Sequence, residues 1–460
     1  MEISNNYNSL ATALRQRRQK LATLTKLPIV LWSGGNVARN YPANTFPFRA
    51  SSHFLYFAGF PLENAAISLD RGRLELFIDN PSPGNTLWHG EMPKREEIAE
   101  KMGADAVFPL ASLERRTPGA ATIAVQDYPT QLRQSQLLKR PLPPANSPQG
   151  IDLELTKAII SLRLTQDAAA LAELRQATAV TMEAHKAGMA RTATAKIEAE
   201  IRAAMESVII AQNMTFAYPS IVTVRGEVLH NEQYHHPLQK GDLLLADVGA
   251  ETAMGWASDV TRTWPVSGKF SPTQRDIYNV VLAAHDACIS KMCTGIKYRY
   301  LHLVAAQTIA EGLVDLGILR GNPNQLVEMD AHALFFVHGI GHLIGLDVHD
   351  MEDFGDLAGY EEGRERDTRF GWKFLRLDRT LCPGMLVSIE PGFYQVPVIL
   401  NNPDVRLKYK DMVNWDKLEQ FADVRGIRIE NDVLVTEQGT EVLTANLPTR
   451  ADEIEQLVTG

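Results

Sequence analysis

Residues 243–248 read LLLADV, and residues 257–266 read ASDVTRTWPV. Each stretch is an apolar, strand-like run that contains one acid, Asp247 in the first and Asp259 in the second. A carboxylate inside an apolar strand is costly to bury unless it is paired or binds a metal. Either aspartate alone would be interpreted as a salt-bridged core residue. Two of them on neighbouring strands favour a metal site instead.

The same pattern returns twice toward the end of the chain. Glu390 lies in VSIEPG and Glu430 lies in GIRIENDVLV, each again an acid inside an apolar run. Before them come HGIGH, residues 338–342, and then His349. The histidine spacing resembles the helical zinc motif HExxH, but glycine disfavours helix interiors, so we expect an irregular or extended segment. Three histidines within twelve positions indicate a functional cluster.

These acids and histidines form a hard, oxygen-rich ligand set. Such a set suits divalent manganese, cobalt or magnesium better than a structural zinc, which prefers thiolate and imidazole. Four carboxylates are more than one divalent ion needs for charge balance. Two ions about 3.5 Å apart, bridged by shared carboxylates, would explain the number of acids and supply a bridging hydroxide.

The rest of the chain predicts an α+β fold in two domains. Helical periodicity at 167–189, from Thr194 as the predicted N-cap to 208, at 272–292 and at 300–316 alternates with apolar β-type runs. Helical pairs that alternate with strand groups are typical of helices packed on a curved, largely antiparallel sheet. The proline-rich segment 139–150, KRPLPPANSPQG, cannot form a core strand or a helix interior. We therefore expect a smaller α/β domain over 1–150 and a larger domain over 151–460.

Composition excludes several classes of protein. The net charge of -9 gives no basic face for nucleic acid. The N-terminus lacks a signal-peptide core, and no stretch is apolar enough over about 18 residues to span a membrane. Three cysteines without CxxC spacing predict inert thiols in a reducing compartment. A soluble cytoplasmic protein is the expectation.

Five spaced motifs resemble one family, the pita-bread metallopeptidases, and most closely their proline-specific branch of aminopeptidase P and prolidase. They are PSIVTVRGEVLHN, LLLADVGAETAMGWASDVTRTWPVSGKFSPTQRDIY, HALFFVHGIGHLIGLDVHD, GMLVSIEPGFY and RGIRIENDVLVT. YPANTFPFRASSHFLYFAGFPLENAA and LWHGEMP are similar to the N-terminal domain of aminopeptidase P. The resemblance implies a C-terminal pita-bread domain for catalysis and an N-terminal domain for oligomerisation and substrate access.

The resemblance also implies a role for each site residue. Asp247 would bind one metal alone, Asp259 and Glu430 would bridge both ions, and His342 and Glu390 would complete the second. The residues with implied catalytic or substrate-binding roles are His230, His338, His349, Glu390, Arg428, Tyr394 and Trp88, the last reaching the site of a neighbouring subunit.

The implied chemistry is hydrolysis of the bond before a proline in second position. The bridging hydroxide would attack the carbonyl, with His349 or His338 donating hydrogen bonds and Glu390 moving a proton to the proline nitrogen. The implied cofactor is a pair of Mn²⁺ ions, with Co²⁺ or Zn²⁺ as alternatives. The implied partners are peptides and further copies of the chain, as a homodimer or homotetramer.

Three other functions remain open. A dipeptidase of prolidase type would use the same residues on dipeptides that end in proline. A non-catalytic peptide-binding module and a metal-free hydrolase of amidino compounds share the fold, but retention of every ligand argues against both. The segment 351–383 is longer than the aminopeptidase P pattern. It is expected to form a loop that could shape the pocket or cover its mouth.

Overall fold

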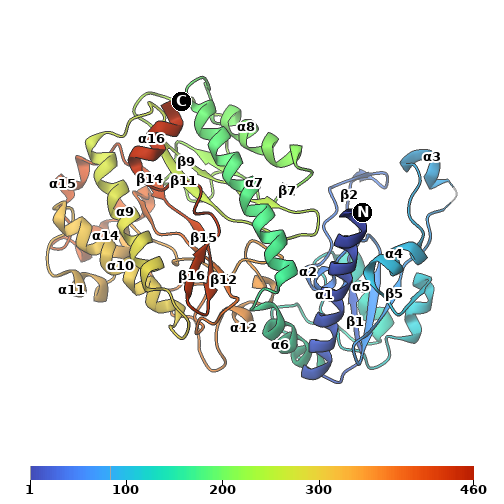
Figure 1. Cartoon of the computed structure of the whole chain (residues 1–460). Coiled ribbons are helices and arrows are strands. Elements are labelled where there is room, and N and C mark those ends of the chain that lie inside the picture. Colours follow the sequence, from blue (N-terminus) through green and yellow to red (C-terminus); the bar gives the residue numbers. More distant parts are fainter. Residues whose placement is uncertain (1, 83, 460) are drawn as a thin grey trace. The chain divides into compact units, whose positions relative to one another are not determined.

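The computed structural model describes residues 2–82 and 84–459, with side chains from residue 9 onward. The chain forms two compact units (Figure 1). The first unit runs to Leu171 and also includes Ala253–Gly255 and Met351–Ala358. The second unit comprises Ala172–Thr252, Trp256–Asp350 and the chain from Gly359 onward. The first unit thus continues beyond Gly150, where the domain boundary is predicted.

A four-stranded sheet forms the centre of the first unit, in the order β1-β4-β5-β6. Its strands are β1 (Ile29–Trp32), β4 (Ala66–Asp70), β5 (Arg73–Phe77) and β6 (Ala106–Phe108). β4 pairs with β1 and β5 in antiparallel fashion, while β5 and β6 are parallel. A parallel pair needs a crossover connection, which contains α4 (Arg95–Met102). A short hairpin, β2 (Ala38–Tyr41) with β3 (Asn44–Thr45), lies apart from this sheet.

The first unit also has the following helices, several of which contact strands of this sheet. They are α1 (Glu2–Leu24), α2 (Ser52–Ala58), α3 (Asn85–His89), η1 (Leu110–Arg115), α5 (Tyr128–Leu138) and α6 (Ile151–Arg163). Every side chain of α2 is buried.

The second unit is built on short antiparallel ladders. β9 (Leu243–Asp247) pairs with β11 (Thr261–Pro265) and β8 (Ile221–Thr223), and β7 (Thr215–Phe216) pairs with β10 (Ala250–Glu251). β15 (Asn431–Thr436) pairs with β12 (Leu386–Ile389) and β16 (Gly439–Val442), and β13 (Gly392–Tyr394) pairs with β14 (Gly426–Arg428). The predicted largely antiparallel sheet is therefore present as several ladders.

One predicted strand is divided in a way that matters for the site. The run 427–435 breaks at Ile429 and Glu430, so that β14 and β15 join different ladders. At the break, the backbone N–H of Glu430 donates to the carbonyl of Thr261, 3.0 Å away. Glu430 therefore lies where the ladders meet.

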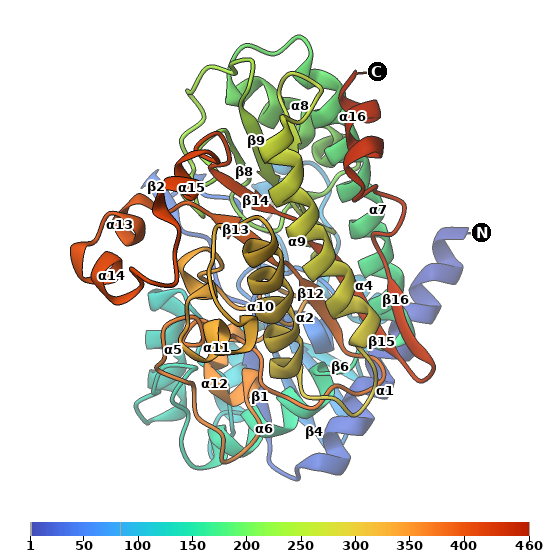
Figure 2. The same cartoon turned by 90° about the vertical axis from the view of Figure 1, so that its left-hand side faces the viewer.

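Long helices pack on these ladders. They are α7 (Ala168–Thr192), α8 (Glu198–Ala211), α9 (Pro272–Lys291) and α10 (Tyr298–Asp315), and α9 and α10 lie side by side (Figure 2). Ser271 and Gln274 form a capping box at the start of α9. The predicted cap of α8 is wrong, because Ile197 occupies the N-cap and the Thr194 hydroxyl donates to the carbonyl of Arg191.

The remaining elements are short. They are α11 (Pro323–Glu328), η2 (His332–Leu334), η3 (Glu352–Phe354), α12 (Asp356–Gly359), α13 (Pro397–Leu400), α14 (Pro403–Lys408), α15 (Trp415–Glu419) and α16 (Ala451–Thr459). Segment 351–383 is mostly irregular, as expected. Among the described residues, no helix combines the length and apolar character needed to cross a bilayer.

Candidate metal centre

The predicted metal ligands come from neighbouring strands of the second unit. Asp247 ends β9 and is the register partner of Thr261, two residues after Asp259. Glu390 directly follows β12, and Glu430 directly precedes β15. The strands β12 and β15 pair with each other. Antiparallel pairing therefore brings together acids that are far apart in the sequence.

The glycines of HGIGH deliver the histidine ligand. The backbone N–H of Ser388 donates to the His342 carbonyl over 3.0 Å, and the His342 N–H donates to the Ser388 hydroxyl over 3.1 Å. Gly341 has φ +153°, and a Cβ there would collide with the Ser388 carbonyl and the Tyr298 hydroxyl. The close approach requires glycine, which explains why this segment is extended rather than helical.

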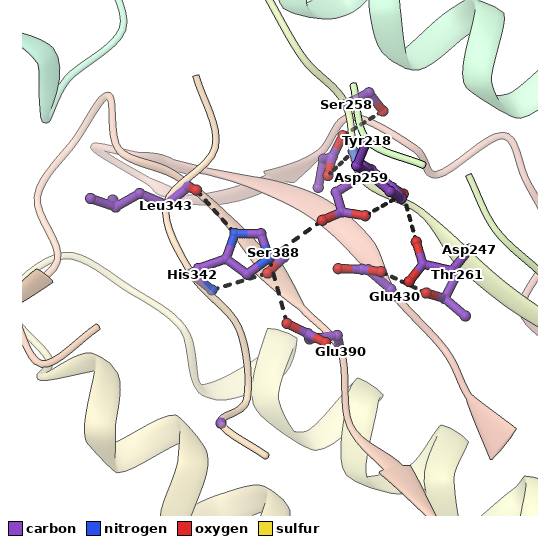
Figure 3. A network of polar contacts seen from close by, with 12 residues as sticks. Tyr218, Asp247, Ser258, Asp259, Thr261, His342, Leu343, Ser388, Glu390 and Glu430 are labelled. Carbon is purple, nitrogen blue, oxygen red and sulfur yellow. Dashed lines mark hydrogen bonds and ion pairs between the residues drawn. The ribbon is translucent and has the colours of Figure 1, made fainter. Parts of the chain in front are cut away.

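The five side chains converge on one small volume (Figure 3). Nε2 of His342 lies 3.3 Å from Oδ2 of Asp259 and 3.6 Å from Oε1 of Glu390. Ligand atoms within 4.8 Å of one another form three sets: Asp247–Asp259–Glu430, His342–Glu390–Glu430 and Asp259–His342–His349. The His349 ring also stacks on His342, with centroids 4.0 Å apart.

Residues around the cluster fix the orientation of the ligands. Nδ1 of His342 lies 3.0 Å from the Leu343 carbonyl, so Nδ1 carries a proton and Nε2 faces the carboxylates, where it could bind an ion once it is deprotonated. The Tyr218 hydroxyl lies 2.6 Å from Oδ1 of Asp247 and 2.6 Å from Oδ1 of Asp259. This orientation leaves the metal-binding atoms pointing toward one another.

The cluster has the chemistry of a cation site. Oε1 of Glu430 is buried and has no hydrogen-bond partner among the described residues, while Oε2 accepts from the Thr261 hydroxyl at 2.7 Å. Burial raises the pKa of Asp247 to about 6 and that of Glu390 to about 7, and it raises the pKa of Glu430 well above its ordinary value. Crowded, desolvated carboxylates with an unsatisfied oxygen fit divalent cations with oxygen and imidazole ligands.

Asp259 differs electrostatically from the other three acids. Burial alone would raise its pKa, but the hydrogen bond and charge of His342 outweigh burial, and the net pKa lies below the ordinary value. Its backbone N–H also faces the Asp432 carboxylate at 3.3 Å. Asp259 is therefore the acid that most readily stays ionised.

A cavity of about 320 Å³ opens on the cluster. It is lined by most of the predicted site residues, namely His230, Asp247, Asp259, His338, His342, His349, Glu390, Arg428 and Glu430. Burial lowers the pKa of His230, and the charges of Arg428 and Arg376 lower it further. Histidines and an arginine at the wall supply hydrogen-bond donors beside the acids.

Tyr394 and Trp88 are not among the residues that line this cavity. Tyr394 is fully buried and contacts two wall residues: its hydroxyl lies 2.8 Å from Nε2 of His338 and accepts from Nη1 of Arg428 at 3.0 Å. Trp88 lies on α3 in the first unit and is 78% exposed. Direct substrate contact thus stays a prediction for both.

The wall also holds residues that the sequence did not single out. Phe374 and Arg376 line the cavity and come from the segment 351–383, so this segment does shape the pocket. Backbone atoms of Phe374 and Leu375 pack so tightly against Gly339 that a Cβ would not fit there. Only the unusual length of the segment indicated such a role, and Tyr218 had no sequence signal beyond its place shortly before an apolar, strand-like run.

Comparisons with known proteins agree with this geometry. The model of metallopeptidase family M24 matches residues 172–437, and the model of the aminopeptidase P N-terminal domain matches residues 14–125. The chain is 32% identical over 429 residues to a probable Xaa-Pro aminopeptidase of Uncinocarpus reesii, covering 90% of this chain and 86% of that protein. A similar protein of Talaromyces marneffei is 31% identical over 431 residues, covering 90% and 88%.

Solved structures resemble nearly the whole chain. The aminopeptidase PepP of Pseudomonas aeruginosa matches with a TM-score of 0.79 and 27% identity, covering 98% of both chains. Zinc-substituted Escherichia coli aminopeptidase P in complex with product matches with the same score, identity and coverage. These structures share the pita-bread fold of the second unit and the preceding N-terminal domain.

Proposed function

Because the chain belongs to metallopeptidase family M24, we propose that it is an Xaa-Pro aminopeptidase, which removes the first residue from peptides whose second residue is proline. The observation that carries the proposal is the convergence of three buried acids, the half-buried Glu390 and His342 beside a cavity lined by three further histidines. The named relatives and the matched N-terminal domain model support this substrate class over other hydrolase activities.

The proposed cofactor is a pair of divalent ions, with manganese as the first candidate. Asp247, Asp259 and Glu430 would hold one ion, and His342 and Glu390 would hold the other together with the shared acids. When bound, such ions supply a bridging hydroxide at neutral pH and polarise the scissile carbonyl. The donor-set chemistry and the unpartnered Glu430 oxygen support this ligand assignment.

The cavity residues would then bind and orient the peptide. Glu390 borders the cavity, where its carboxyl group can pass a proton to the leaving proline nitrogen. Proline has no N–H to offer a binding site, so the ring must be held by shape. His230 and His349 face the cavity and would donate hydrogen bonds to the substrate or to the developing oxyanion.

His338 is better assigned a supporting role than that of a hydrogen-bond donor to the substrate. Arg428 donates to the Tyr394 oxygen, so the Tyr394 proton points to Nε2 of His338. Nδ1 of His338 then carries its proton toward the Gly339 carbonyl, 2.7 Å away. Both ring nitrogens are thus occupied, and burial and the Arg428 charge lower the pKa of His338 to about 3, which keeps the ring neutral.

One observation keeps the dipeptidase as a second candidate. Arg376 adds a positive charge to the cavity wall, where it could pair with the free carboxylate of a very short substrate. The relatives named as Xaa-Pro aminopeptidases favour the longer substrate. We also propose that residues 1–150 serve oligomerisation and substrate access in a cytoplasmic homodimer or homotetramer.

The test is hydrolysis of Xaa-Pro, Xaa-Pro-Yaa and longer peptides by manganese-loaded enzyme. Asp259→Ala should abolish metal binding and cleavage, while Asp411→Ala, which removes an exposed aspartate remote from the acids, should change neither. Cleavage of tripeptides and longer peptides would support the aminopeptidase, and cleavage of the dipeptide alone would replace it with prolidase. No cleavage, or less than one ion per chain, would refute the proposal.

A further inference from the structure

The chain leaves the catalytic unit directly after a cavity residue. His349 and Asp350 belong to the second unit, whereas Met351–Ala358 belong to the first unit. The backbone N–H of Asp350 donates to the Leu343 carbonyl at 3.0 Å, and Met351 is fully buried with φ +62°. Few free dihedral angles therefore separate His349 from the part of the segment that packs in the first unit.

Asp353 attaches this segment to α2 of the first unit. Its Oδ2 lies 2.7 Å from Nε2 of His53, and the His53 ring stacks on Phe354 with centroids 4.4 Å apart. Nη1 of Arg163 lies 3.0 Å from Nδ1 of His53. The arginine side chain can only donate hydrogen bonds, so Nδ1 of His53 accepts from Arg163. Nε2 of His53 therefore carries the ring proton and donates a hydrogen bond to Asp353.

The imidazole of His53 is fully used by these contacts. It is 3% exposed and is followed in α2 by the apolar run FLYFA, so it has no access to solvent or substrate. Burial alone would raise the pKa of Asp353, but the hydrogen bond from His53 and the nearby charge of Arg163 outweigh burial, and the net pKa is lowered. A fully satisfied buried polar network fixes one geometry more strictly than apolar packing does.

A second loop from between site residues is bound by a residue just before α2. Ala253–Gly255 lie between the metal ligands Asp247 and Asp259 but belong to the first unit. Nη2 of Arg49 donates to the Gly255 carbonyl over 3.2 Å, and Nη1 of Arg49 binds the Ser52 hydroxyl at 2.7 Å. The start of α2 thus binds two loops, each of which continues directly into site residues.

We infer that His53 is a positioning residue for His349, acting through its hydrogen bond to Asp353. By holding Asp353 and Phe354, His53 fixes the segment that begins two residues after His349 and so limits the positions that the His349 ring can take. The role of His349 toward substrate rests on the proposed function, whereas the anchoring of the segment does not. Misplacement of a catalytic group by about 1 Å can cost a large factor in rate.

The anchoring is tested by hydrogen–deuterium exchange of peptides covering 343–358 in the whole, substrate-free protein. His53→Ala should speed exchange of the Asp350 amide by about tenfold, the loss expected for one buried hydrogen bond. His53→Gln, whose amide nitrogen can donate to Asp353, should restore most of the protection. Asp353→Ala removes the same contact from the loop side and should reproduce the effect even if His53→Ala fails to fold.

The matched control is Arg140→Ala, which breaks the partly buried ion pair with Asp152 in the same unit and leaves residues 351–358 unchanged. It should leave exchange at Asp350 unchanged. Equal exchange in His53→Ala, Asp353→Ala and Arg140→Ala would overturn the inference, as would a failure of His53→Gln to restore protection.

Kinetics provide the second readout. With the metal content unchanged, His53→Ala should lower kcat for Xaa-Pro-Yaa peptides about tenfold and alter KM less, and His53→Gln should recover kcat. An unchanged kcat despite faster exchange would overturn the positioning of His349. A wild-type protein without peptidase activity would refute the proposed function, while the exchange result would still decide the anchoring.

Discussion

The hydroxyl oxygen of Tyr394 lies 2.8 Å from Nε2 of His338, although only the histidine reaches the cavity wall. The same oxygen accepts from Arg428, so the tyrosine proton points to Nε2, while the Gly339 carbonyl, 2.7 Å from Nδ1, holds the imidazole proton on the other nitrogen. Burial raises the pKa of Tyr394 to about 12, which keeps that proton in place at neutral pH. A buried residue therefore helps to hold the tautomer and orientation of a residue at the wall.

Tyr394→Phe should impair both stability and catalysis. The substitution leaves Nε2 of His338 and one Arg428 donor without their partner in a buried environment, which costs about 1–3 kcal/mol of unfolding free energy. Without the hydrogen bond to Nε2, the His338 ring is held on one side only and can reorient, and we expect kcat/KM to fall by about tenfold or more. Urea denaturation and peptide kinetics on the same preparation measure the two effects.

Tyr278→Phe is the matched control for this change. Tyr278 is also fully buried in the second unit, and its hydroxyl donates to the Thr449 carbonyl at 2.6 Å. It should lose comparable stability and keep its activity. Equal kinetic losses in the two variants would show that Tyr394 acts only through general stability.

The ladders of the second unit were predictable where a strand is a single apolar run. LLLAD became β9 because it is apolar up to its last residue, and TRTWP became β11 because threonine and tryptophan favour strands. The run 427–435 was predicted as one strand, but the chain leaves one ladder before Glu430 and enters another after it. Local pattern cannot reveal such a break, because the break depends on Thr261, far away in the sequence.

The site shows the same limit. Acids inside apolar runs are visible in a sequence because burying a charge demands a reason, and all four of them lie in the cluster. The sequence did not predict roles for Tyr218, Phe374 and Arg376, because a tyrosine near a strand and a charged loop are ordinary sequence features. Whether Tyr394 lines the cavity or supports it depends on side-chain direction, which motif matching does not give.

Metal removal should make stability depend on pH. In the metal-free protein, burial raises the pKa values of Asp247, Glu390 and Glu430. The folded protein then keeps these protons to a higher pH than the unfolded chain, so its stability falls as pH rises from about 4 through about 7. Divalent ions bind the deprotonated carboxylates, so the stabilisation they provide grows over the same range. The melting-temperature gap between manganese-loaded and chelator-treated protein should widen from about pH 5 to about pH 8.

Glu390→Gln provides the control for this pH dependence. The variant removes one of the carboxyl groups whose pKa is raised, so its metal-free form should lose less stability with rising pH than the metal-free wild type. Calorimetry at constant ionic strength measures both slopes. A gap that stays constant with pH would show that the buried acids are already ionised without metal.

Trp88→Ala tests the prediction that this residue serves the site of a neighbouring subunit. Trp88 is 78% exposed, so its removal should leave the melting temperature within about 1–2 °C of the wild type. We expect kcat/KM to fall several-fold, and light scattering should find an oligomer. Leu87 lies on the same helix and is 80% exposed, so Leu87→Ala should change neither the melting temperature nor kcat/KM. Normal activity of Trp88→Ala would leave that tryptophan without a role in catalysis.

Arg376→Gln tests whether the cavity binds the free carboxylate of a short substrate, the observation that keeps the dipeptidase as a second candidate. Arg376 lines the cavity, and its charge contributes to lowering the pKa of His230, so it lies within electrostatic reach of any bound substrate. If it pairs with a substrate carboxylate, its loss should raise KM by about 10- to 100-fold for Xaa-Pro and Xaa-Pro-Yaa peptides with a free C-terminus, the effect of one charge-assisted hydrogen bond. C-terminal amides of the same peptides should be little affected. Lys373→Gln removes a neighbouring exposed charge outside the cavity wall and should leave both KM values unchanged. Should acids and amides respond equally to Arg376→Gln, the arginine would not read the carboxylate, and the case for a dipeptidase would lose its structural support.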